Sequence, residues 1–148
     1  MNRKTKKGKN LKYLISKAIL AEKESFYLET IFLCHSIIEE RLRSTVLKTD
    51  STFGKRHKIP TTIGRFKRYI NNEEYLFDIY YKKDFLKKIL KWKKAKRDPL
   101  MHELERNINI IDDKEKLELI AKEGINLMRE LNATVMKWKR KAKKQKII

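Results

Sequence analysis

The sequence predicts an all-α protein, a compact up-and-down bundle of about five helices with basic N- and C-terminal extensions. Only four glycines and two prolines occur in 148 residues, and so few turn-forming residues disfavour turn-rich β architectures. Hydrophobic residues make up 41% of the chain and charged residues 39%, a balance typical of long amphipathic helices. Apolar residues also recur at helical spacing over long stretches.

The length and the charge distribution predict one domain with two basic ends. A chain of 148 residues can bury one sizeable core but not two. We expect residues 1–9 to form a basic, mobile arm, residues 10–140 the helical domain, and residues 141–148 a basic tail.

The first two helices are predicted between Leu11 and Leu47, a stretch without glycine or proline. Its apolar residues form stripes at helical spacing, with a hinge expected near Glu24 and Ser25. The segment 48–60 lacks this periodicity and is rich in turn-forming residues, so it predicts the longest loop.

The middle of the chain predicts two further helical regions. After Pro60, Thr61 or Thr62 is expected to cap a helix that runs to about Ile70 and ends at the asparagine pair 71–72. The next region has lysines around most of its circumference and an apolar side. That side consists of Phe85, Leu86, Ile89, Leu90 and Trp92.

The C-terminal third predicts a short apolar stripe and then a long helix that Asp112 or Asp113 would cap. The stripe comprises Leu100, Leu104, Ile108 and Ile111. The long helix carries two sets of residues spaced by seven, which predict a seam buried against neighbouring helices or a second chain. The sets are Leu117, Gly124, Leu131 and Trp138, and Ala121, Met128 and Val135.

Several kinds of site have no support in the sequence. It lacks a glycine-rich phosphate loop and the H-E-x-x-H, C-x-x-C and G-x-S-x-G motifs, which argues against P-loop, zinc-protease and serine-hydrolase chemistry. We expect no metal and no cofactor. The single cysteine, Cys34, lies among apolar residues and is expected in the core.

The net charge of +19 predicts a polyanionic partner, with nucleic acid first. Lys94 and Lys96 are the strongest individual predictions for nucleic-acid contacts, because they lie beside the motif described next. No apolar run reaches the length of a membrane span or a signal-peptide core. We therefore expect a cytoplasmic protein without membrane contact.

The three histidines differ in their predicted roles. His35, amid apolar helical residues, is expected to be a hydrogen-bonded core or interface histidine. His57 falls in a basic loop, where solvent or phosphate contact is expected. His102 is about 160° to 200° around the helix from Leu100 and Leu104, so it is expected to face solvent.

The segment "KRDPLMHEL" is the predicted active site. Asp98 before Pro99 predicts a helix start, with Asp98 accepting from the N–H groups of the following turn, Leu100 and Met101. The preceding helix would then end near Lys96 or Arg97. This break would let Arg97 fold back toward His102, which would be about 140° away on an unbroken helix.

An arginine beside an exposed histidine suits metal-independent RNA cleavage. His102 could take the proton of a ribose 2′-OH, while Arg97 holds the phosphate and stabilises its growing negative charge. Glu105 could orient the imidazole and Arg106 could add a second cation, although both also fit ordinary helix-surface pairs.

The run "RDPLMH" at residues 97–102 resembles the R-x4-6-H signature of the HEPN superfamily, the higher eukaryote and prokaryote nucleotide-binding domains. In that signature the arginine is commonly followed by Asn, Asp or His, and Asp98 matches. The resemblance covers residues 10 to 140 by pattern. It implies a helical-bundle, metal-independent endoribonuclease, commonly a toxin or phage-defence effector, that acts on RNA as a homodimer.

The resemblance has one departure and leaves two alternatives. HEPN toxins silenced by tyrosine nucleotidylation have a tyrosine two residues after the histidine, where this chain has Leu104. Control by nucleotidylation is therefore not implied, and an antitoxin or other regulatory partner is left open. The alternatives are a non-catalytic RNA- or DNA-binding module and a protein-interaction module.

Overall fold

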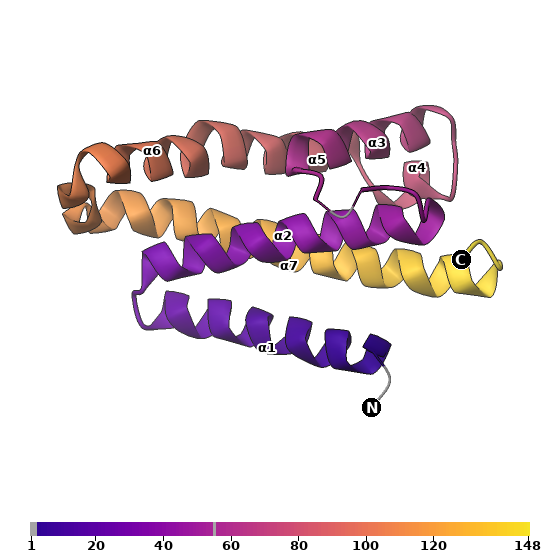
Figure 1. The fold of residues 1–148 in the computed structure, drawn as a ribbon, viewed down its shortest axis with the longest axis horizontal. Helices are drawn as coiled ribbons and strands as arrows, with labels where there is room; N and C mark the ends of the chain where they lie inside the picture. The colour runs from indigo at the N-terminus through magenta and orange to yellow at the C-terminus, as the bar shows by residue number, and fades with distance from the viewer. Residues whose placement is uncertain (1–2, 55) are drawn as a thin grey trace. The chain divides into compact units, whose positions relative to one another are not determined.

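A computed structural model describes residues 3–54 and 56–148 of the chain (Figure 1). These residues form helices and no strand, which confirms the predicted all-α class. The chain divides into two compact units. Unit 1 comprises Met1–Ile37 and Trp92–Met128, and unit 2 comprises Ile38–Lys91 and Arg129–Ile148.

This division differs from the single domain expected over residues 10–140. Helix α2 (Tyr27–Thr49) and helix α7 (Lys114–Lys144) each contribute residues to both units. Helices of 23 and 31 residues are long enough to supply apolar side chains to two cores. The first half of the predicted basic tail, residues 141–144, belongs to α7, which runs to Lys144.

Helix α1 (Arg3–Lys23) includes most of the segment expected to be an arm. The segment 3–9 is helical, and lysine and arginine are good helix formers; residues 1 and 2 lie outside the described part of the chain. The hinge before α2 is confirmed, since Ser25 adopts a left-handed φ of 65° between the helices. In Figure 1 the chain reverses direction at this turn.

Helix α3 (Ile59–Asn71) begins earlier than predicted, and neither expected threonine caps it. Lys58 occupies the N-cap position, and the Thr62 hydroxyl donates to the Lys58 carbonyl at 3.1 Å from inside the first turn. Pro60, whose fixed φ suits a first helical turn, brings the start forward. The predicted end at the asparagine pair is confirmed.

The region after α3 consists of five consecutive helical segments. They are α4 (Phe77–Tyr80), α5 (Lys83–Trp92), a π-helical turn η1 (Lys93–Arg97), α6 (Asp98–Arg106) and the 3-10 helix η2 (Ile108–Asp112). Within unit 1, η1 leads into α6 without an intervening loop.

The apolar stripe predicted from residue 100 to residue 111 holds only at its start. Leu100 is buried, but Ile108 and Ile111 are 71% and 42% exposed. Because α6 ends at Arg106 and η2 has a different period, Ile110 is buried instead. Asp113 caps α7 as predicted, since its carboxylate accepts from the Lys116 N–H at 3.2 Å.

Trp92 is the largest buried side chain of unit 1. Its indole N–H donates to the Ile120 carbonyl at 3.0 Å, and its ring packs against Gly124, where an added Cβ would lie 2.8 Å from a ring carbon. Cys34 borders the same glycine, and burial raises the pKa of its thiol to about 12. Cys34 is therefore a core residue, as predicted.

The core of unit 2 contains an aromatic cluster. The ring of Phe77 stacks on those of Tyr69 and Trp138, with both centroid separations at 5.1 Å. The indole N–H of Trp138 donates to the Tyr75 carbonyl at 2.8 Å. The seam predicted on α7 is buried throughout, in the residues Leu117, Ala121, Gly124, Met128, Leu131, Val135 and Trp138.

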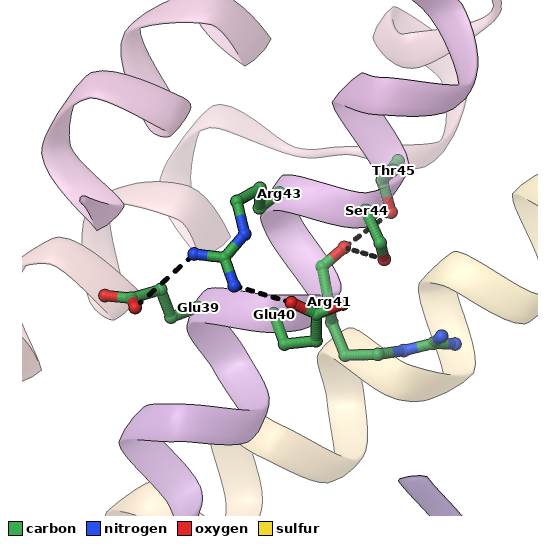
Figure 2. Close-up of polar contacts among 6 residues, drawn as sticks. All are labelled: Glu39, Glu40, Arg41, Arg43, Ser44 and Thr45. Atoms are coloured by element: carbon green, nitrogen blue, oxygen red, sulfur yellow. Dashed lines mark hydrogen bonds and ion pairs between the residues drawn. The ribbon is translucent and has the colours of Figure 1, made fainter. Parts of the chain in front are cut away.

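Two arginines of α2, both in unit 2, have different surroundings (Figure 2). Arg43 forms ion pairs with Glu39 at 3.7 Å and Glu40 at 2.6 Å. The Arg41 guanidinium points away from these glutamates, and its Nε is buried without a hydrogen-bond partner. Arg41 is only 6% exposed, and burial is the largest influence that lowers the pKa of its guanidinium.

Candidate catalytic site

The helix does not break at Asp98-Pro99, which corrects the prediction. Asp98 has helical φ and ψ values of −65° and −45°, and its N–H donates to the carbonyl of Lys93, five residues earlier. Residues 93–97 therefore form a π-helical turn, and α6 follows without a cap. The side chain of Asp98 does not accept from Leu100 or Met101 as expected.

Proline explains why a π turn lies at this point. Within a regular α-helix, Pro99 would lack an N–H donor and its ring would clash with the carbonyl of Ala95, four residues earlier. A π turn contains more residues per turn than an α turn and relieves such local crowding. π turns inside α-helices also occur frequently at functional sites.

Asp98 joins two cations instead of capping a helix. Its Oδ2 accepts from Lys93 Nζ at 2.6 Å, and its Oδ1 accepts from Arg97 Nη1 at 2.9 Å. In a regular helix residues five apart are about 140° apart, so the π turn is what brings Lys93 to Asp98. Burial raises the pKa of the carboxyl, but the bonds from Lys93 and Arg97 outweigh it, and the net shift is downward.

His35 on α2 lies beside this cluster, which the sequence did not predict. Its imidazole is partly buried, and burial lowers its pKa to about 4, with the charges of Arg97 and Lys93 acting in the same direction and that of Asp98 opposing. His35 Nε2 and Arg97 Nε are both buried without hydrogen-bond partners. The predicted hydrogen bond of His35 is thus absent at Nε2, and no spacing in the sequence links His35 to Arg97.

His102 is exposed, in agreement with the prediction from its position on the helix. Arg97, however, bonds to Asp98 and lies near His35, and no hydrogen bond joins it to His102 in the described part of the chain. The expected fold-back of Arg97 is therefore wrong, because the uninterrupted helix keeps the two side chains on different sides. Glu105 and Arg106 are also exposed.

The two lysines predicted to bind nucleic acid have different environments. Lys94 is exposed, whereas Lys96 forms an ion pair with Glu123 on α7. An internal carboxylate thus offsets the charge of Lys96. His57, predicted to lie in a basic loop, packs on the ring of Phe53 with a centroid separation of 4.4 Å.

The cluster of Lys93, Arg97, Asp98 and His35 combines two cations, one carboxylate and one uncharged imidazole. Such a set can hold an anionic oxygen and contains a base in its neutral form. Within residues 3–54 and 56–148, no three His, Cys, Asp or Glu side chains gather as metal ligands would. None of the helices described combines the length and apolar character needed to cross a membrane.

Comparison with protein-family models, curated proteins and solved structures finds no match to this chain. The fold and the cluster define an all-α protein in which a π-helical turn carries Lys93 and Arg97 and His35 of α2 lies near them. The resemblance to HEPN domains stays a prediction that rests on the motif at residues 97–102.

Proposed function

We propose that this chain is a metal-independent endoribonuclease of the HEPN type. One observation carries the proposal: a π-helical turn holds Arg97 and Lys93 on a shared carboxylate and leads directly into the helix that bears the exposed His102. The net charge of +19 supports RNA as the substrate, since it attracts a polyanion at long range.

The proposed reaction is an attack of the ribose 2′-oxygen on the adjacent phosphorus. His102 takes the proton from the 2′-OH as the new P–O bond forms. The bond between phosphorus and the 5′-oxygen breaks, and that oxygen receives a proton. The products are a 2′,3′-cyclic phosphate and a 5′-hydroxyl, and Arg97 stabilises the negative charge that develops on the phosphorane.

A homodimer fits this chemistry better than a single chain. One histidine cannot readily act as base and acid in a single step, whereas two protomers supply two motifs. We propose that such a dimer acts in the cytoplasm as a toxin or phage-defence effector. An antitoxin or other regulatory partner would restrain it.

The test is RNA cleavage by the purified protein in excess EDTA, followed by analysis of the product ends. We expect His102→Gln to reduce the cleavage rate by a factor of about 100 or more, the range of general acid–base catalysis, and Arg97→Ala to reduce it comparably. His57→Gln is the matched control, since this histidine packs on Phe53 outside the cluster. Far-ultraviolet circular dichroism would verify the helical fold of each variant.

The outcome for His35 separates two versions of the mechanism. If His35→Gln abolishes cleavage while His102→Gln does not, the base is the histidine beside Arg97 rather than the one in the motif. If cleavage by both variants equals that of the wild type, the endoribonuclease proposal is wrong.

The separation of Arg97 from His102 favours a second candidate, a non-catalytic RNA- or DNA-binding module. Such a protein would bind nucleic acid with a steep salt dependence and yield no cleavage products. Its affinity would depend on the sum of its basic surfaces and would not fall specifically when Arg97 or His102 is replaced.

A further inference from the structure

A cavity of about 280 Å³ lies between α3 and α5 within unit 2. Lys67 and Asn71 line it from α3, and Lys83, Asp84 and Lys87 line it from α5. On each helix the lining includes two residues four positions apart, which project from the same face. We call this cavity the lysine cleft.

Among the residues that the structure describes, no carboxylate forms an ion pair with the three lysines of the cleft, unlike several lysines of unit 1. In unit 1, Lys93, Lys96 and Lys116 form ion pairs with acidic residues. In the lysine cleft, by contrast, Lys83 Nζ donates to the amide oxygen of Asn71 at 2.6 Å. An amide oxygen orients an ammonium group without cancelling its charge.

The charge of the cleft is also unbalanced within its own lining. Asp84 is the one carboxylate there, against three ammonium groups. Lys83 and Lys87 are like charges at i and i+4, an arrangement that destabilises a helix slightly unless an anion lies between them. A bound anion would remove this repulsion.

We propose that the lysine cleft binds consecutive phosphates of single-stranded RNA, as a backbone-binding site distinct from the motif at residues 97–102. The proposal rests on the proposed function for its choice of RNA as the polyanion. No aromatic side chain lines the cavity, so base stacking is not the expected mode of binding. The contacts would be electrostatic and independent of sequence.

The position of the lysines along a cleft between two helices favours a single strand over a duplex. Phosphates of a single strand can follow a cleft between two helices, because the strand bends freely. A double helix presents its phosphates on a stiff, convex surface. Cleavage through the 2′-OH likewise needs a backbone that can rearrange around the reacting phosphate.

The experiment measures the salt dependence of RNA binding. The probe is a labelled oligouridine of about 12 nucleotides with 2′-O-methyl riboses, which cannot be cleaved by 2′-OH attack. Its affinity is measured by fluorescence anisotropy between about 50 and 300 mM NaCl. The cleft variant combines Lys67→Gln, Lys83→Gln and Lys87→Gln, all at exposed positions.

Three direct phosphate contacts should contribute about 2 to the slope of log affinity against log salt, since each single-strand contact contributes about 0.7. We therefore expect the cleft variant to lose about 2 from the slope and about tenfold in affinity at moderate salt. The control combines Lys137→Gln, Lys141→Gln and Lys144→Gln, exposed lysines of α7 in the same unit. It removes the same charge and should leave the slope near that of the wild type.

The outcomes separate this proposal from the proposed function. Equal slopes for the two variants, or a larger loss in the α7 variant, would overturn the lysine cleft as an RNA site even if the protein cleaves RNA. A selective loss in the cleft variant supports it even if no cleavage is ever observed. A wild-type protein that does not bind the probe overturns it, and an acidic protein becomes the alternative partner.

Discussion

Each of the two units has a buried tryptophan with a hydrogen-bonded indole in its core, but the units differ in how their cations are paired. Each has a fully buried tryptophan whose indole N–H donates to a backbone carbonyl, Trp92 in unit 1 and Trp138 in unit 2. In unit 1, Lys93 and Arg97 are both paired with Asp98. In unit 2, Arg43 and Arg65 form ion pairs too, but Arg41 Nε has no hydrogen-bond partner and, among the described residues, no ion pair involves the lysines of the cleft.

This difference shows that the surroundings of each cation, more than the net charge of +19, decide whether it can attract an external anion. A cation that is paired internally is oriented for a local task but contributes little to long-range attraction. An unpaired cation is available to an external anion, or it is a cost to the fold.

The largest effect is expected from Gly124→Ala in unit 1. The new methyl would lie 2.8 Å from the ring of Trp92, which is fully buried and cannot move aside. We expect the free energy of unfolding to fall by about 2 kcal/mol, as for other overpacked cores. Chemical denaturation measures this change.

The control for Gly124 is Gly64→Ala on α3, where no atom lies within 4 Å of the added methyl. Alanine is a better helix former than glycine, so this variant should be more stable by up to about 1 kcal/mol. Equal changes in the free energy of unfolding for the two variants would show that the packing of Trp92 does not require a glycine at position 124.

An intermediate effect is expected from Arg41→Met in unit 2. Burying a guanidinium whose Nε has no hydrogen-bond partner is unfavourable, and methionine retains a similar apolar length. We expect the free energy of unfolding to rise by about 1 kcal/mol. In contrast, Arg97→Met should lower it by less than about 1 kcal/mol, because it removes a partly exposed ion pair. Destabilisation by Arg41→Met would mean that this guanidinium has a favourable role in unit 2.

An effect confined to acidic pH is expected in the dependence of stability on pH. The pKa of His35 falls to about 4 in the folded chain, below its ordinary value near 6.5. The unfolded chain thus binds more protons between these pH values, so stability from this group is lost as the pH falls from about 6.5 to 4. Denaturation of the wild type and His35→Gln at several pH values should show a shallower loss in the variant.

His102→Gln is the control for this measurement, because that imidazole is exposed in the folded chain. It should leave the pH dependence close to that of the wild type. Identical curves for wild type and His35→Gln would mean that the cluster of Arg97 and Lys93 does not affect the protonation of His35.

Local sequence patterns predicted most of the helices. They could not predict contacts between segments that are distant in the sequence. The hinge at Ser25, the cap at Asp113 and the buried seam of α7 all depend on residues near one another in the sequence. The nearness of His35 to Arg97, seen in the effect of the Arg97 charge on the pKa of His35, depends on how α2 and η1 are placed in unit 1, which no periodicity in the sequence predicts. An α-helix does start at Asp98, but the expected helix break and side-chain cap there were wrong because Asp-Pro also fits a π turn, which local rules do not anticipate.

The π turn also sets the rotational register of α6 within unit 1. One residue more or fewer in residues 93–97 would rotate α6 by about 100° relative to Trp92 of the same unit. The direction in which His102 and Arg106 project therefore depends on the length of a five-residue segment that contains neither of them. In this helix, the number of residues before the motif matters as much as their identity.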